Sequence, residues 1–471
     1  MQRIERRSVK NMNAKQHSPG ITEHLIGEVR QLAGAALPDD ALEAARNSVM
    51  DWLGVTIAGA DDAMVHSLIA AAREQGGSAQ ASVIWHGEQT SAAFAALING
   101  SASDSLDFAD SNQNMRGHST PAVVATALAM AESRKLSGLQ FLRGVIAGVE
   151  AECRVGLLVQ KGLKPGFHPT GNIAPFGAAA AAAWLRDLPA EQWPHALGVV
   201  ATQASGLHNS GGTMSKPFHS GKAAMNGVLS ASLAAHGFTG RPNAIEASEG
   251  FLSTHSDSVG EELMRAADGR YLILDTTFKS HAACGLTHDT IDNILQAKRE
   301  HSLSTDMISH IDIDVPVLHL RVCNIQQPAS GLQAKFSLRV VAAMALLGED
   351  TTDINAYTAA LAARPDLVAL RERITVNGRS ELSSASLANI ELADGRRISV
   401  SSDARKPVRD QALKGEAVSK KFLLLATPVL GRQAAESLHR LLATLQHLES
   451  IKPLVDGAAK RPAAIAPRLK G

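Results

Sequence analysis

Two short polar segments contain the residue types that could do chemistry in this chain. The first, at 106–121, reads Leu-Asp-Phe-Ala-Asp-Ser-Asn-Gln-Asn-Met-Arg-Gly-His-Ser-Thr-Pro, and the second, at 211–222, reads Gly-Gly-Thr-Met-Ser-Lys-Pro-Phe-His-Ser-Gly-Lys. Each places carboxylate, imidazole or ammonium groups just before a long apolar run. Polar groups that enter a core need partners or a chemical role. These groups suit proton transfer on an anionic substrate.

The first segment combines two aspartates with a histidine. Asp107 and Asp110 are three residues apart, so we expect them to share one helix face or turn. Capping of a following helix explains part of this polarity, but it does not explain His118. We therefore favour a functional interpretation of the segment.

A helix is predicted over 121–132, because proline is tolerated in the first turn of a helix. Ser119 or Thr120 could cap it. The free N–H groups at such a helix start also favour a carboxylate ligand.

Two further segments precede apolar helices. His168 lies within Gly-Phe-His-Pro-Thr-Gly-Asn at 166–172, where the glycines and proline imply a fixed backbone path. Lys216 precedes a helix predicted from Gly221, where a cation would hold a substrate carboxylate, or transfer a proton if burial lowered its pKa. Gly221-Lys222 is not a phosphate-binding loop, because Lys216 and Ala223 stand where that motif needs glycine and Ser or Thr.

The sequence pattern changes from helical to strand-type near residue 279. The segment at this point is Lys279-Ser280-His281-Ala282-Ala283-Cys284-Gly285, followed by His288. The two histidines have no carboxylate or cysteine framework at a familiar metal-binding spacing. We therefore expect a hinge lined by Lys and His, with no metal ion and no cofactor.

The elements that must position these residues are helices from about 20 to 270. Asp39-Asp40 precede one helix, and the Ala-rich run 173–185 and the run 221–235 indicate others. After about 275 the pattern changes to strands. Period-two alternation indicates a strand at 310–315 that continues to 322, and Arg373-Ile374-Thr375-Val376 indicates a second.

A hairpin is predicted around Asp394-Gly395, between strands at 388–392 and 397–400. Helical patterns at 287–298, 333–347 and 353–362 lie between the strands, and helix resumes from 415 to about 448. The predicted fold is mainly α, with a large helical domain and a smaller α+β lid. The expected division is a disordered lead-in at 1–21, a helical domain from 22–275 plus 405–450, a lid at 276–404, and a flexible tail at 451–471.

Composition excludes several classes of function. The 471 residues include 46 Lys+Arg and 46 Asp+Glu, so no global charge favours nucleic acid or a membrane surface. Aromatic residues make up only 4%, which disfavours base-stacking platforms. Three separated cysteines predict neither disulfides nor zinc, and no secretory or transmembrane segment is expected, so we predict a cytoplasmic protein.

Taken together, the chain resembles the MmgE/PrpD family from about residue 22 to 445. The order of the motifs over the whole length makes the resemblance specific. They are Asp51-Trp52-Leu53-Gly54-Val55, Asn99-Gly100, Leu106-Asp107-Phe108, His118, Gly166-Phe167-His168-Pro169-Thr170, Gln203-Ala204-Ser205-Gly206, Lys216-Pro217, His219-Ser220-Gly221, Gly237-Phe238-Thr239-Gly240 and Gly331-Leu332-Gln333-Ala334-Lys335-Phe336-Ser337.

The resemblance implies a homodimer and metal-independent chemistry between the two domains. It implies removal of a proton next to a carboxylate of a small di- or tricarboxylate. It carries the family's site residues onto Asp107, Ser111, His118, His168, Lys216, Lys279 and Cys284. Of these, we assign His168, Lys216, Asp107 and His118 to catalysis, with His168 and Lys216 as the candidate acid/base pair. The residues assigned to substrate binding are Ser111, Lys279, Cys284 and His219.

Departures from the family pattern bear on the reaction. Ala109, Ser111 and Asn112 replace Asp, Thr and His, Cys284 stands where the decarboxylases have histidine, and Val340 stands where several members have tyrosine. These losses favour epimerisation of an iminodisuccinate-like amino or imino dicarboxylate, which needs only two acid/base groups flanking one carbon. The alternatives are a lyase, either a 2-methylcitrate-type dehydratase or a cis-aconitate-type decarboxylase, and a non-catalytic ligand-binding dimer.

Overall fold

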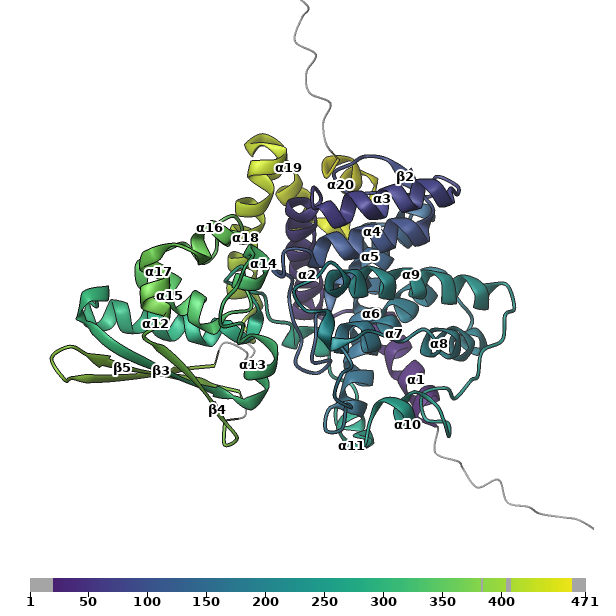
Figure 1. The fold of residues 1–471 in the computed structure, drawn as a ribbon. Helices are drawn as coiled ribbons and strands as arrows, with labels where there is room; N and C mark the ends of the chain where they lie inside the picture. The colour runs from purple at the N-terminus through teal and green to yellow at the C-terminus, as the bar shows by residue number, and fades with distance from the viewer. Residues whose placement is uncertain (1–19, 383, 404–407, 460–471) are drawn as a thin grey trace, which may run out of the picture.

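The computed structural model describes residues 20–382, 384–403 and 408–459. The chain builds a large helical body and a smaller α+β part, which we call the lid (Figure 1). This agrees with the predicted fold class. The predicted boundaries at 276 and 404 stay predictions, and residue 404 lies outside the described residues.

The helical body is made from both ends of the chain. Most of its apolar side chains form one large core, and those of α3 form a small separate cluster with part of α4. Its helices are α1 (Ile21–Gly34), α2 (Asp39–Gly59), α3 (Ala63–Gln75), α4 (Ala92–Asp104), α5 (Thr120–Ser133), α6 (Gly138–Val159), α7 (Pro169–Leu185), α8 (Trp193–Ala201), α9 (Ser215–Ala235), α10 (Phe251–His255), α11 (Glu261–Arg265), α18 (Gln411–Leu430), α19 (Arg432–Ala443) and α20 (Lys452–Gly457). A two-stranded ribbon pairs β1 (Ala81–Ser82) with β2 (Gln89–Thr90). Among the described residues, no single helix is long and apolar enough to cross a membrane, although α2 and α3, bent by 88°, pass that test as a pair.

The lid is a four-stranded sheet with helices packed on one face. Its elements are α12 (His288–His301), β3 (Ile308–Pro316), α13 (Val317–Val322), α14 (Gly331–Ala334), α15 (Leu338–Leu347), α16 (Ala359–Ala362), α17 (Pro365–Arg371), β4 (Ile374–Arg379), β5 (Ser386–Leu392) and β6 (Arg397–Ser402). The strand order is β4-β3-β5-β6, with β3 and β4 parallel and the other pairs antiparallel. Helices α12 and α15 lie along one side of this sheet (Figure 1).

Several predicted lid elements are confirmed. The apolar positions of β3 are buried and the intervening polar ones are partly exposed, as period-two alternation requires. The hairpin turns at Asp394 and Gly395, where the glycine has φ +86°.

Other predictions were wrong in detail. Residues 317–322 form α13 rather than a continuation of the strand, because Pro316 ends the β3 ladder and has no N–H to extend it. The helix predicted over 333–347 is broken, since Ser337 caps a new helix, and only Ala359–Ala362 of 353–362 is helical. The C-terminal helix begins at Gln411 and is interrupted at Gly431, with φ +81°.

The predicted termini also need correction. Ile21 already belongs to α1, and the rest of the predicted lead-in, residues 1–19, lies outside the described residues. Residues 451–459 are ordered rather than a flexible tail, because the buried Leu454 and Val455 pack α20 against the helical core. Residues 460–471 lie outside the described residues.

Glycines let the helices that position the polar segments approach closely. A Cβ on Gly221 of α9 would lie 2.1 Å from the Leu97 carbonyl oxygen of α4, and one on Gly227 would lie 2.4 Å from the Ala178 Cβ of α7. Since real Cβ atoms do not make such contacts, these positions need glycine. The close approach of α9 and α4 brings Lys216 and Asp104 together.

We expect Gly221→Ala to lower the free energy of unfolding by about 1–3 kcal/mol, because the added methyl group must displace the α4 backbone. Urea denaturation followed by circular dichroism measures this change. Gly27→Ala is the matched control. Gly27 is an exposed position of α1 and a Cβ there meets nothing within 4 Å, so the same substitution should raise the free energy of unfolding by about 0.5–1 kcal/mol. Equal effects of the two substitutions would contradict the close-approach explanation.

Candidate functional site

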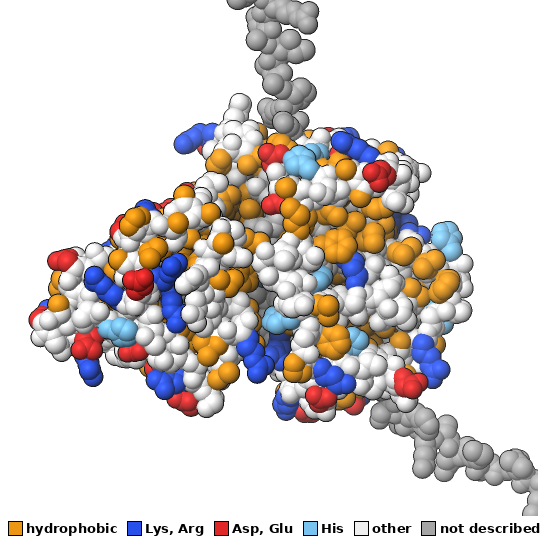
Figure 2. Space-filling view, in the orientation of Figure 1, with side chains coloured by type: hydrophobic (Ala, Val, Ile, Leu, Met, Phe, Trp, Pro, Cys, Tyr) orange, Lys and Arg blue, Asp and Glu red, His pale blue; other side chains and the backbone are white. Residues whose placement is uncertain are grey.

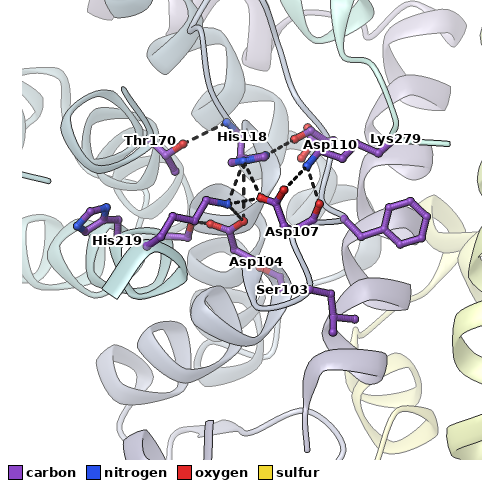
Figure 3. Close-up of polar contacts among 12 residues, drawn as sticks. Ser103, Asp104, Asp107, Asp110, His118, Thr170, His219 and Lys279 are labelled. Carbon is purple, nitrogen blue, oxygen red and sulfur yellow. Dashed lines mark hydrogen bonds and ion pairs between the residues drawn. The ribbon is translucent and has the colours of Figure 1, made fainter. Parts of the chain in front are cut away.

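The two polar segments meet where the end of α4 and the start of α9 face the junction between body and lid. Asp104 is the last residue of α4, and Asp107 follows in the left-handed region with φ +53°. Figure 3 shows Asp104, Asp107 and His118 directed toward one another, with Lys279 approaching Asp107 from the other side. The structure therefore brings Asp107, His118, Lys216 and Lys279, four of the predicted site residues, into one cluster.

Lys216 lies in the first turn of α9, because that helix begins at Ser215 and not at Gly221 as predicted. Its Nζ donates hydrogen bonds to Asp104 Oδ1 at 2.8 Å and Asp107 Oδ1 at 2.7 Å, and lies 3.3 Å from His118 Nε2. Burial alone would favour the neutral amine, but the two carboxylates outweigh it and raise the pKa of Lys216. Lys216 is therefore a fixed ammonium group. Its pKa is raised, whereas the proton transfer considered from the sequence needs a lysine whose pKa burial has lowered.

His118 is a neutral imidazole whose tautomer is set by its neighbours. Its Nδ1 lies 2.7 Å from the Asp110 carbonyl oxygen, which can only accept, so Nδ1 carries the proton. Nε2 then presents its lone pair to Lys216. Burial and the Lys216 charge lower the pKa of His118 to about 4, so the ring is uncharged at neutral pH and can act as a base.

Asp107 is an ionised carboxylate between two ammonium groups. Although burial opposes ionisation, Lys216 and Lys279 together hold the pKa of Asp107 far below its usual range. Lys279 Nζ donates to the Asp107 backbone oxygen at 2.6 Å and to Oδ2 at 3.2 Å. Since Lys279 precedes the lid, this contact joins the junction to the helical body.

Asp110 does not share a face with Asp107, contrary to the prediction. It turns to the start of α5, where it accepts hydrogen bonds from Ser119 Oγ, Thr120 Oγ1 and the Thr120 backbone N–H. Asp110 is thus the cap that the sequence assigned to Ser119 or Thr120, and it occupies the helix start suggested for a substrate carboxylate. Burial raises the pKa of Asp110 to about 6 despite these hydrogen bonds.

His168 and His219 form a second group beside the cluster. Their Nδ1 atoms lie 3.0 Å apart, so one ring donates a proton and the other accepts it. Burial and the Lys216 charge hold the pKa of His168 well below its usual value. Neither ring bonds the cluster directly, but two residues after His168 the Thr170 hydroxyl accepts from the His118 backbone N–H at 3.2 Å.

The remaining predicted residues, Ser111 and Cys284, lie at the junction. Ser111 pairs with Thr277 through two backbone hydrogen bonds of 2.9 and 2.8 Å. Cys284 is buried beside Cys323, and a hydrogen bond with that thiol lowers the pKa of Cys284. Both therefore border the cluster without a direct hydrogen bond to Asp107 in the part of the chain that the structure describes.

Two residues of the site were missed by sequence reasoning. Asp104 is fully buried and holds both Lys216 and the Ser220 hydroxyl, the latter at 2.8 Å. A three-residue spacing of aspartates, at 104, 107 and 110, was the available signal. Lys335 bonds the Leu106 carbonyl oxygen from the lid at 2.8 Å, and it was noted only within a family motif.

A divalent cation has one candidate position in the described residues. The ligand atoms of Asp104, Asp107 and His118 lie within 4.8 Å of one another. The Lys216 ammonium group already contacts all three side chains, so the protein's own cation fills that position.

The cluster is largely closed from solvent. The side chains of Lys216 and His118 are 12% and 13% exposed, whereas Asp107 and Lys279 are 4% and 5% exposed. Figure 2 shows a groove on this face between body and lid, with basic and histidine side chains at its edge. Such partial burial strengthens the interactions of a bound anion with the ammonium groups.

The chain is similar to known proteins over most of its length. The family model described as MmgE/PrpD N-terminal domain matches residues 23–263, and the one described as MmgE/PrpD C-terminal domain matches residues 281–447. Cis-aconitate decarboxylase of Mus musculus is 25% identical over 458 residues, covering 92% of each chain. The Homo sapiens enzyme is 26% identical over 459 residues, covering 92% of this chain and 93% of that one. A cis-aconitate decarboxylase of Aspergillus terreus is 26% identical over 472 residues, covering 93% and 95%.

We expect the His118 ring to stay neutral from pH 5.5 to 8, because its pKa is lowered to about 4. NMR of protein labelled at the histidine ring carbons, with assignment by a His118→Gln variant, should show no titration of His118 in this range. In Lys216→Met the repelling charge is gone, so the pKa of His118 should rise. A wild-type midpoint near 6.5 would contradict this assignment.

Proposed function

This chain belongs to the MmgE/PrpD family, and from that premise we propose that it is a cofactor-independent lyase acting on a small di- or tricarboxylate. The proposed reaction is loss of CO2 through a carbanion next to a carboxylate. The relatives named cis-aconitate decarboxylase support this choice over the epimerisation favoured by the sequence.

The arrangement of Lys216 is the observation that carries the proposal. Its ammonium group is fixed by Asp104 and Asp107 and lies beside a neutral imidazole, in a site only slightly open to solvent. A charged donor held in a fixed position stabilises negative charge as it develops on a substrate. An adjacent neutral ring, His118 or His168, can accept a proton.

The proposed step balances without a cofactor. The bond from carbon to the leaving carboxylate breaks, CO2 departs, and the electron pair stays on carbon as a carbanion stabilised by Lys216 and Lys279. The Lys216 ammonium group then gives a proton to that carbon. Solvent returns a proton to the amine, so one proton is consumed for each CO2 released. This step needs no second proton, so His168, predicted to form an acid/base pair with Lys216, has a proton-transfer role only in the epimerisation considered next.

Epimerisation is the second candidate, because two neutral imidazoles from separate segments lie near Lys216. Burial lowers the pKa of both His118 and His168. One ring could remove a proton from an α-carbon while another group returns one to the opposite face. Cys284, in place of the histidine of the decarboxylases, also favours this alternative.

Turnover in D2O distinguishes these reactions. With cis-aconitate and a panel of di- and tricarboxylates, NMR should show CO2 loss and one deuterium at the newly protonated carbon. EDTA should not change the rate, because Lys216 fills the candidate cation position. Racemisation with deuterium exchange and no CO2 would favour the epimerase, and loss of activity on chelation would contradict metal independence.

Lys216→Arg keeps the positive charge but is a poor proton donor. We expect kcat to fall by about 10²–10⁴-fold with a small change in KM, because the proton is supplied after substrate binds. Lys161→Arg is the matched control, since Lys161 also pairs with a carboxylate, Glu262 at 3.0 Å, but on the exposed surface. Near-native kcat in a correctly folded Lys216→Arg would exclude Lys216 as the proton donor.

We also propose that the protein is a homodimer through the face of α9. Exposed apolar side chains lie on this helix and next to its two ends: Leu229 within it is 43% exposed, Met214 just before it 54% and Phe238 just after it 53%. Figure 2 shows hydrophobic side chains gathered over the region where Figure 1 places α9. Such a patch is typical of an interaction surface.

Light scattering should give twice the chain mass of 49.5 kDa. Phe238→Lys should shift the protein toward the monomer, because it places a charge in the apolar contact. Leu413→Lys, at a position 56% exposed on α18, is the control and should remain dimeric. A wild-type monomer at micromolar concentration would contradict the proposal.

A further inference from the structure

Lys335 lies in the lid but reaches the turn of the helical body that contains Asp107. It follows α14 directly, and its Nζ donates a hydrogen bond to the Leu106 carbonyl oxygen at 2.8 Å. The residue is 5% exposed, so its ammonium group is held away from bulk water. No step of the proposed reaction uses it.

The ammonium groups around Asp107 differ in their counter-charges. Lys216 contacts two carboxylates, at 2.8 and 2.7 Å, and Lys279 contacts one at 3.2 Å. Across the described ranges, Lys335 has no carboxylate within 4.0 Å; it contacts the Leu106 carbonyl, and its Nζ lies 5.4 Å from the centre of the Tyr357 ring. Since an ammonium group has three N–H donors, Lys335 can donate further hydrogen bonds to a ligand.

Lys335 lacks the charge pairing of the other two lysines. The carboxylates of Asp104 and Asp107 contact the ammonium groups of Lys216 and Lys279, but no carboxylate of the described residues contacts that of Lys335. Burial lowers the pKa of Lys335 to about 8, and repulsion from Lys279 and Lys216 acts in the same direction against the attraction of Asp107. A carboxylate bound at Nζ would supply the missing counter-charge.

We propose that Lys335 is a substrate-anchoring residue that binds a second carboxylate of the substrate from the lid side of the site. This inference rests on the proposed function, because it assumes the same class of ligand. A substrate with two carboxylates then bridges the Lys216–Lys279 cluster and the lid, whereas a monocarboxylate engages only one side. Lys335 thus selects for polycarboxylates and ties their binding to the position of the lid.

Titration calorimetry with propane-1,2,3-tricarboxylate, a non-reacting probe, tests this role on the full chain. Lys335→Gln should weaken binding by about 10- to 100-fold, as expected for a charge-assisted hydrogen bond in a buried site. Lys335→Arg should retain most of the affinity. For a substrate that turns over, Lys335→Gln should raise KM more than it lowers kcat.

Glutamine keeps an N–H donor that can bond the Leu106 carbonyl oxygen, but it lacks the positive charge. The variant therefore distinguishes binding of a substrate carboxylate from a purely structural hydrogen bond between lid and body. Lys298→Gln is the matched control, because Lys298 also bonds a lid carbonyl, that of Leu346 at 2.7 Å, away from the site. Unchanged affinity in Lys335→Gln, or an equal loss in both variants, would overturn the anchoring role alone. If wild-type protein neither bound the tricarboxylate nor turned over any polycarboxylate, the proposed function would fail and this inference with it.

Discussion

The buried Lys216 ammonium group is the interaction on which the site depends. It contacts side chains from the end of α4, the following turn and the start of the 118–120 segment, so its removal would leave Asp104 and Asp107 without their shared counter-charge. The cost of an uncompensated buried charge explains why these elements must stay together. The same contacts fix the protonation of their members: Lys216 charged, Asp107 ionised and His118 neutral. Lys279 and Lys335 extend this network to the lid.

Sequence patterns predicted the fold where one local signal decided the structure. The alternation in β3 and the Asp394-Gly395 turn each determine an element from a few residues, and both were predicted correctly. One error arose where a local signal, a proline, outweighed the alternating pattern, and another where contacts distant in sequence decide. The 317–322 segment alternates as a strand does, but it becomes α13 because β3 has no ladder beyond Pro316. The final residues form α20, which packs against α19. The Ala458 carbonyl oxygen just after it accepts a hydrogen bond from the Trp85 backbone N–H, far earlier in the chain, and composition alone cannot indicate such contacts.

The grouping of four candidate residues agrees with the sequence analysis, but their charges could not be predicted from the sequence. Residue types and family motifs identified Asp107, His118, Lys216 and Lys279, and the structure brings these four together. Burial of Lys216 suggested a lowered pKa, yet Asp104 and Asp107 reverse that shift. The outcome depends on distances of 2.7–2.8 Å between residues more than a hundred positions apart, and spacing within a segment contains no such information. Asp110 likewise caps α5, because the chain folds so that its carboxylate lies at the start of that helix.

The origin of the helical body from both ends of the chain has a consequence for biosynthesis. Gly54 of α2 packs directly against Phe422 of α18, so this face of α2 stays uncovered while the whole lid is translated. Gly54 and Phe422 are 368 positions apart, so at about 5–20 residues per second the interval between their synthesis is roughly 20–70 s. The nascent body therefore keeps apolar surface of α2 exposed during that time, a condition that favours aggregation. The lid core, by contrast, is made mostly of residues that emerge consecutively, between 282 and 400, but Val55, Phe108 and Leu425 of the body also pack into it. Because Leu425 belongs to α18, this core too is completed only after α18 is made.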